Sequence, residues 1–164
     1  MALRLEDIEL IKQLKGRYFR SIDTADKDAL TDMFIPDARI CYFGGTYEFE
    51  AEGRDNIVGA LTAAFHDQFA SIHNGHCPEI DVLSDDRAEG IWYLQDWSLD
   101  LNTKISTHGA AIYRDKYVKV DGKWKIKEST YSRIYEQVDE LKELPNITAR
   151  VLAGNVKVPE RKPW

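Results

Sequence analysis

The second half of the chain limits the possible folds most strongly, because it consists almost entirely of long runs rich in β-forming residues. Short polar segments separate these runs, and Asp121-Gly122 is a clear turn signal. Long consecutive strands joined by short turns form an antiparallel meander. The predicted strands cover residues 71–83, 87–101, 105–120 and 123–135, with turns at residues 84–86, 102–104 and 121–122.

Helices are predicted before this meander. A long helix over residues 5–22 follows from apolar residues that recur at spacings of three and four, the pattern of one helical face. Asp26 is a suitable N-cap for a shorter helix over residues 27–34, which Pro36-Asp37 should end. The apolar residues of the first helix are Ile8, Ile11, Leu14, Tyr18 and Ile22.

A hairpin and a third helix are expected next. Two β-rich runs, at residues 39–43 and 46–50, flank Gly44-Gly45, a pattern typical of a hairpin. The third helix should cover residues 55–69. Its inward side would carry Ile57, Leu61, Ala64 and Phe65.

This order of elements predicts the fold class. Helices followed by a meander are typical of an α+β domain rather than of alternating βαβ units. We expect a curved antiparallel sheet with N-terminal helices, enclosing a pocket at its open end. Residues 1–144 should form this single domain. Residues 145–164 carry three prolines and few aromatic residues, so they predict a C-terminal arm or tail.

Charge and cysteine content exclude several partners. The formal net charge of −6 argues against binding to nucleic acid or to an anionic membrane surface. No apolar run approaches the roughly 20 residues that span a bilayer, and the N-terminus does not resemble a signal peptide. Cys41 and Cys77 are far apart without a CxxC motif, which predicts no disulfide framework and a cytoplasmic location.

Asp23 and Tyr18 are candidate site residues near the end of the first helix. Asp23 could be a turn or cap residue, but Asp26 already occupies the better cap position. Tyr18 lies on the apolar face, and its hydroxyl needs a partner when it is buried. The alternative interpretation is that Tyr18 is an ordinary core tyrosine. Both side chains could line one end of the hollow.

The segment 71–78 carries two histidines of opposite strand parity. His73 and His76 should therefore point to opposite faces of a regular strand, unless Gly75 marks a bulge. This parity, together with the absence of HExxH and of a cysteine cluster, argues against a metal site. A half-buried structural histidine is the alternative to catalysis for each of them.

Three more polar residues lie in the predicted strands. Asp96 shares strand parity with the apolar Trp92 and Leu94, so it is either near water or a pocket group. Arg133 is out of phase with the inward residues before it, which requires either a bulge near residues 128–129 or a contact with another subunit. His108 has small neighbours that could leave room for a ligand.

Several segments resemble bacterial bile-acid 7α-dehydratases of the SnoaL-like (nuclear transport factor 2-like) family. The resemblance covers roughly residues 8–136, in matching order. It is carried by Leu14-Lys15-Gly16-Arg17-Tyr18-Phe19-Arg20 with Asp23, His73-Asn74-Gly75-His76-Cys77-Pro78-Glu79-Ile80, Gly90-Ile91-Trp92-Tyr93-Leu94 with Asp96, Tyr113-Arg114-Asp115-Lys116-Tyr117, and Trp124-Lys125-Ile126-Lys127-Glu128 through Tyr131 and Arg133.

The resemblance implies a cone-shaped domain and a cofactor-free lyase, as in the related scytalone dehydratase and hexachlorocyclohexane dehydrochlorinase. It implies that His73 is the base and that Asp23 orients it, with Tyr18, Asp96 and Arg133 as further catalytic residues. Tyr42 resembles a pocket tyrosine, and His108 resembles a second pocket histidine. The expected reaction is loss of water from a hydrophobic hydroxy-carbonyl or hydroxy-enone substrate such as a steroid.

Two departures and two alternatives accompany this interpretation. The turn around residues 102–104 is shorter than in the bile-acid enzymes, and the C-terminal tail diverges. An isomerase or cyclase could use the same base, and the fold also serves as a non-catalytic small-molecule-binding module. Apolar residues at alternate positions of one strand, Ile91, Tyr93 and Trp97, predict a homo-oligomer, and the resemblance suggests a trimer.

Overall fold

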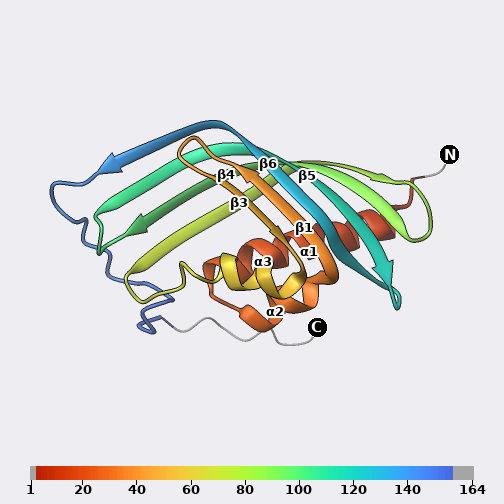
Figure 1. The fold of residues 1–164 in the computed structure, drawn as a ribbon, viewed down its shortest axis with the longest axis horizontal. Helices are drawn as coiled ribbons and strands as arrows, with labels where there is room; N and C mark the ends of the chain where they lie inside the picture. Colours follow the sequence, from red (N-terminus) through yellow and green to blue (C-terminus); the bar gives the residue numbers. More distant parts are fainter. Residues whose placement is uncertain (1–2, 157–164) are drawn as a thin grey trace.

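The computed structural model describes residues 3–156, in which a curved six-stranded sheet arches over three helices (Figure 1). The end of the predicted arm, residues 157–164, lies outside the described residues. Among residues 3–156, no helix has the length and hydropathy needed to cross a membrane. The elements are α1 (Leu5–Asp23), α2 (Lys27–Met33), β1 (Phe34–Phe43), β2 (Glu48–Glu52), α3 (Arg54–Leu61), β3 (Phe69–Val82), β4 (Arg87–Asp100), β5 (Ile105–Val120) and β6 (Lys123–Glu140).

The strand order of the sheet is β2-β1-β6-β5-β4-β3. Strands β3 to β6 form the predicted antiparallel meander, and the α+β fold class is confirmed. The sheet is mixed rather than wholly antiparallel, because β1 pairs with β6 in parallel. The β1–β2 hairpin thus lies beside the last strand of the meander, which leaves β3 as an edge strand.

Two helices end earlier than the sequence pattern predicts. Helix α2 ends at Met33, and Pro36 lies in the irregular stretch of β1 where pairing with β6 is interrupted, a place that suits a residue without a backbone N–H. Helix α3 ends at Leu61, and tighter turns follow after Thr62, whose hydroxyl donates to the carbonyl of Val58 at 2.8 Å. Those turns carry Ala64 and Phe65 to the pocket wall.

Strand β3 keeps regular alternation from its start through His76. His73 lies on the inner face, whereas His76 stacks on Tyr93 of β4 with ring centres 6.1 Å apart on the outer face. The parity prediction is therefore confirmed. The bulge follows later, at Cys77-Pro78, where Cys77 has a φ of +50°. Gly75 is regular, and its missing side chain admits the ring of Phe19.

Two irregularities in β6 decide which of its residues face inward. Pairing with β5 shifts once around Lys127 and again around Ile134. The first shift resets the alternation, so Ser129, Tyr131 and Arg133 follow Ile126 onto the inner face. Of the two explanations for Arg133, the bulge is correct, and it lies one residue before the predicted position.

The described part of the C-terminal arm packs beside the start of β3. A guanidinium nitrogen of Arg150 donates to the carbonyl of Asp67 at 2.5 Å. Val151 and Leu152 share a shallow cavity with Asp23 and Trp97. The arm therefore follows the same sheet edge at which helix α1 ends (Figure 1).

Substitution of Gly75 by alanine should destabilise the fold, because the new Cβ would lie 2.1 Å from Cε2 of Phe19. We expect the free energy of unfolding in urea to fall by about 1–3 kcal/mol. Gly16→Ala is the matched control, since no atom lies within 4 Å of its Cβ position in α1. That change should stabilise by up to about 1 kcal/mol. Equal effects of the two changes would contradict the packing argument.

Candidate active site

Asp23 ends helix α1 beside the edge strand β3 and accepts three hydrogen bonds there. The donors are the Ser71 hydroxyl at 2.8 Å, the backbone N–H of His73 at 2.9 Å and Nδ1 of His73 at 2.7 Å. Because a carboxylate only accepts, Nδ1 of His73 donates to Asp23, and in the neutral imidazole Nε2 is the nitrogen with the free lone pair. The carboxylate therefore fixes both the tautomer and the position of the imidazole.

A second contact, against one face of the ring, also holds the imidazole of His73. Its ring stacks on that of Phe19, with ring centres 6.3 Å apart and planes within 8°. The side chains of His73 and Asp23 are 21% and 19% exposed, so the pair is shielded but reachable. His73 lines the cavity enclosed by the helices and the concave face of the sheet. This is the arrangement of a general base with an orienting carboxylate.

Tyr18 and Tyr42 form a second feature of the cavity. Their hydroxyl oxygens are 2.9 Å apart, and both residues are less than 5% exposed. Burial, reinforced by the neighbouring phenols, raises the pKa of both tyrosines well above the ordinary value. Both phenols therefore stay protonated at neutral pH. Tyr42 donates to the hydroxyl of Ser129 and accepts from Tyr18, so the hydroxyl of Tyr18 is the one that can turn to donate to an oxygen in the cavity.

Asp96 and Arg133 form a bidentate ion pair in the cavity wall. The two guanidinium NH groups donate to the two carboxylate oxygens at 2.5 and 2.9 Å. Nε of Arg133 lies 3.4 Å from a carboxylate oxygen of Glu136. Burial opposes the charge of Arg133, but the hydrogen bonds and charge of Asp96 outweigh it and raise the pKa of Arg133. Gly109 leaves room for the guanidinium, since a Cβ there would lie 2.9 Å from it.

The cavity that joins these groups has a volume of about 390 Å³. Apolar side chains from the helices, the following turns and the strands form much of its wall. Five tyrosines also reach it. The lining includes Tyr18, Ile22, Tyr42, Tyr47, Phe49, Leu61, Ala64, Phe65, Phe69, Ser71, His73, Leu94, Asp96, Ser98, Thr107, Tyr113, Tyr131 and Arg133.

Six of the seven predicted site residues belong to this cavity or its dyad, but His108 does not. Strand β5 directs Thr107 and Gly109 inward, which places His108 on the outer face, where its ring meets that of Tyr135. The assignment of His108 to the pocket is therefore wrong. Among the described residues, no cluster of three or more His, Cys, Asp or Glu side chains could hold a metal ion.

Sequence reasoning missed four residues of the site, which are Tyr47, Tyr113, Tyr131 and Glu136. Tyr47 comes from the loop between β1 and β2, and its hydroxyl contacts that of Tyr131. Tyr113 shares its strand parity with Ala111, a signal that could have placed it inward. Glu136 accepts from the backbone N–H and the hydroxyl of Thr46, so it ties this loop to Arg133. Only the folded hairpin reveals that connection.

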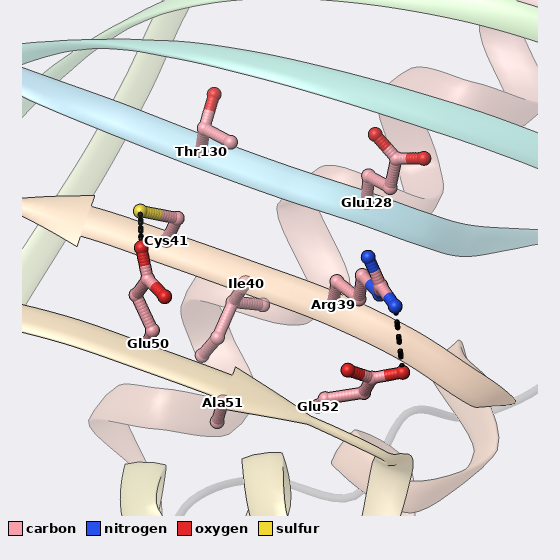
Figure 2. A pocket seen from close by; sticks show the side chains of 8 residues that line it. All are labelled: Arg39, Ile40, Cys41, Glu50, Ala51, Glu52, Glu128 and Thr130. Atoms are coloured by element: carbon pink, nitrogen blue, oxygen red, sulfur yellow. Dashed lines mark hydrogen bonds and ion pairs between the residues drawn. The ribbon is translucent and has the colours of Figure 1, made fainter.

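A second, open groove lies on the outer face of the sheet, over β1, β2 and β6 (Figure 2). Half of its lining side chains are charged, and Arg39 pairs with Glu52 at 2.8 Å. Cys41 donates to Glu50. Burial and that contact raise the pKa of the Cys41 thiol to about 11, so it is not a thiolate nucleophile at neutral pH. Neither Asp23 nor His73 lines this groove.

Comparison with known proteins identifies the family to which this fold belongs. The model of the SnoaL-like domain matches residues 3–130, which is most of the chain. The chain belongs to the SnoaL-like domain family. Within this SnoaL-like chain, the matched region contains every residue of the site except Tyr131, Arg133 and Glu136.

Solved structures of the same fold include enzymes. Hexachlorocyclohexane dehydrochlorinase from Novosphingobium barchaimii LL02 is 19% identical, with a TM-score of 0.74 over 89% of this chain and 97% of that one. A candidate scytalone dehydratase from Novosphingobium aromaticivorans is 21% identical, with a TM-score of 0.73 over 88% and 95%. At such identities the likeness shows the fold alone. The finer resemblance to bile-acid 7α-dehydratases stays a prediction.

The buried Asp96–Arg133 ion pair of this SnoaL-like domain should contribute far more to stability than the exposed Arg39–Glu52 pair. Asp96→Asn removes the bidentate partner of Arg133, whose side chain is 8% exposed, and leaves the guanidinium only its 3.4 Å contact with Glu136. We expect a loss of about 1.5–3 kcal/mol in the free energy of unfolding. Glu52→Gln is the control, because both side chains of the Arg39–Glu52 pair are 66% exposed. Urea unfolding should show a change below about 1 kcal/mol for that variant.

Proposed function

We propose that this chain is a cofactor-free lyase that eliminates water from a hydrophobic hydroxy-carbonyl or hydroxy-enone substrate of steroid-like character. The Asp23–His73 dyad beside a largely apolar cavity carries this proposal. Structural neighbours that include a dehydrochlorinase and a candidate dehydratase support lyase chemistry. A binding module needs no oriented imidazole, and the pairing of Asp23 with His73 favours an enzyme.

The first step removes a proton from the carbon beside the carbonyl group. Nε2 of His73 takes the proton, and the electron pair of the C–H bond moves toward the carbonyl oxygen, giving an enolate. Asp23 stabilises the imidazolium that forms. Tyr18, supported by Tyr42, donates to the enolate oxygen, and one such donor contributes on the order of 10²–10³ in rate.

The second step breaks the carbon–oxygen bond. The enolate electrons return to form the carbon–carbon double bond, and the hydroxyl leaves with the proton that His73 had taken. Asp96 is bound to Arg133, so it acts as an acceptor that orients the departing hydroxyl. The guanidinium already faces Asp96 and Glu136, which makes Arg133 a poor site for an anionic substrate tail.

Removal of the base should abolish turnover while leaving the fold intact. We expect His73→Ala and Asp23→Asn each to lower the rate by about 10²–10⁴. His76→Ala is the matched control, because this histidine lies on the outer face of the same strand. The assay follows loss of water by mass spectrometry on a panel of hydroxy-enone steroids. Full activity of His73→Ala would exclude the dyad, and an unchanged product mass would indicate an isomerase or cyclase.

We also propose that the outer face of the sheet joins copies of this chain, with a trimer as the favoured assembly. Ile72, Tyr93 and Tyr135 are 49%, 42% and 45% exposed there. Exposed apolar side chains on one face are typical of an interface. Light scattering after gel filtration should give a multiple of the monomer mass, and Tyr93→Glu should reduce it. A monomeric wild type would contradict this assembly.

A further inference from the structure

A charged pair that the proposed reaction does not use lies beneath the tyrosines of the cavity. Nζ of Lys15 in α1 is 2.7 Å from Oδ2 of Asp115 in β5, and neither side chain has exposed surface. Moving two charges out of water costs free energy that close contact only partly returns. Apolar residues of similar size would pack equally well at these positions. Packing alone therefore does not explain why a charged pair occupies them.

Hydroxyl groups connect Asp115 to the cavity. The hydroxyl of Ser129 donates to Oδ1 of Asp115 at 2.6 Å, and the hydroxyl of Tyr42 donates to that of Ser129 at 3.5 Å. The hydroxyl of Tyr42 is in turn 2.9 Å from that of Tyr18. Because the carboxylate of Asp115 can only accept, the hydroxyl proton of Ser129 points to Asp115. The oxygen of Ser129 then accepts the hydrogen bond from the hydroxyl of Tyr42.

Lys15 places its amine group under the aromatic rings of the same cluster. Burial lowers the pKa of Lys15, whereas the charge and hydrogen bond of Asp115 favour its ammonium form. Its ammonium nitrogen is 3.6 Å from the ring centre of Tyr113 and 4.9 Å from that of Tyr18. Burial is the main cause of the raised pKa of Tyr18 and Tyr42, and the negative charge of Asp115 adds to it. The ammonium group offsets that charge, which would otherwise oppose an anion in the cavity.

We propose that Lys15 and Asp115 are positioning residues for an oxyanion bound at Tyr18. Asp115 acts through Ser129 to hold the hydroxyl of Tyr42, the hydroxyl of Tyr18 turns from Tyr42 to the bound oxyanion, and Lys15 balances the charge of Asp115 beneath them. The inference rests on the proposed function and deepens it. It assigns the tyrosine end of the cavity to an enolate-like or phenolate-like oxygen.

A double substitution separates this role from a purely structural one. Lys15→Met and Asp115→Asn each leave one buried charge without its partner, so each should destabilise strongly. Lys15→Met/Asp115→Asn removes both charges at similar volume and should recover most of the stability. A structural pair predicts that the double variant also recovers ligand binding. A positioning pair predicts that it does not.

The probe for this test is 4-nitrophenolate, with 4-nitroanisole as a neutral ligand of similar shape. Both affinities are measured by quenching of the intrinsic fluorescence. We expect the folded double variant to bind 4-nitrophenolate about tenfold more weakly than wild type, while binding of 4-nitroanisole changes less than about twofold. Equal binding of 4-nitrophenolate by the two proteins would overturn the proposal.

A second pair of variants keeps the test decisive if the double variant does not fold. Ser129→Ala and Tyr117→Phe each remove one hydroxyl that donates to Asp115, at 2.6 and 2.7 Å. Only Ser129 lies between Asp115 and Tyr42. We expect Ser129→Ala to weaken 4-nitrophenolate binding about threefold to tenfold and Tyr117→Phe to leave it unchanged. Equal effects of these two substitutions would overturn the proposal.

The two proposals fail in different ways. If wild type binds 4-nitrophenolate with the expected variant pattern but dehydrates no hydroxy-enone, the proposed reaction is wrong and the oxyanion assignment stands. If wild type does not bind 4-nitrophenolate, the oxyanion assignment is wrong, even where turnover of a hydroxy-enone is observed.

Discussion

The buried contact between Lys15 and Asp115 joins helix α1 to strand β5 of the sheet. Lys15 is anchored to the centre of β5, and the next residues on that helical face are Tyr18 and Phe19, three and four positions later. The same rotation brings Asp23, two turns further on, to the edge strand β3. This ion pair therefore adds a directional contact to the apolar packing that holds Tyr18 and Asp23 in place.

The irregularities of β6 matter in the same way. Alternation along a strand has a period of two, so one added residue exchanges the inner and outer faces beyond it. The shift around Lys127 moves Ser129, Tyr131 and Arg133 inward together. One local change in pairing thus supplies the support of Tyr42, one wall of the cavity and the partner of Asp96.

Much of this could be predicted from the sequence, because it depends on local periodicity. The helix α1, the four long strands and the opposite faces of His73 and His76 follow from spacing alone. Contacts between distant segments could not be predicted in the same way. The parallel pairing of β1 with β6 and the link from Glu136 to the hairpin loop depend on how the chain returns on itself. The sequence analysis did not single out Lys15, although a lysine beside the apolar face of a helix can indicate a buried partner without identifying it.

The position of Asp23 on the sheet edge has a consequence beyond chemistry. The free N–H groups of an edge strand can pair with a strand of another molecule, and proteins commonly block them. The carboxylate of Asp23 occupies the N–H of His73, and the arm that carries Arg150 follows the same edge. The carboxylate of Asp23 therefore also protects this edge against strand-to-strand aggregation, so a substitution there would expose a backbone donor as well as release the imidazole.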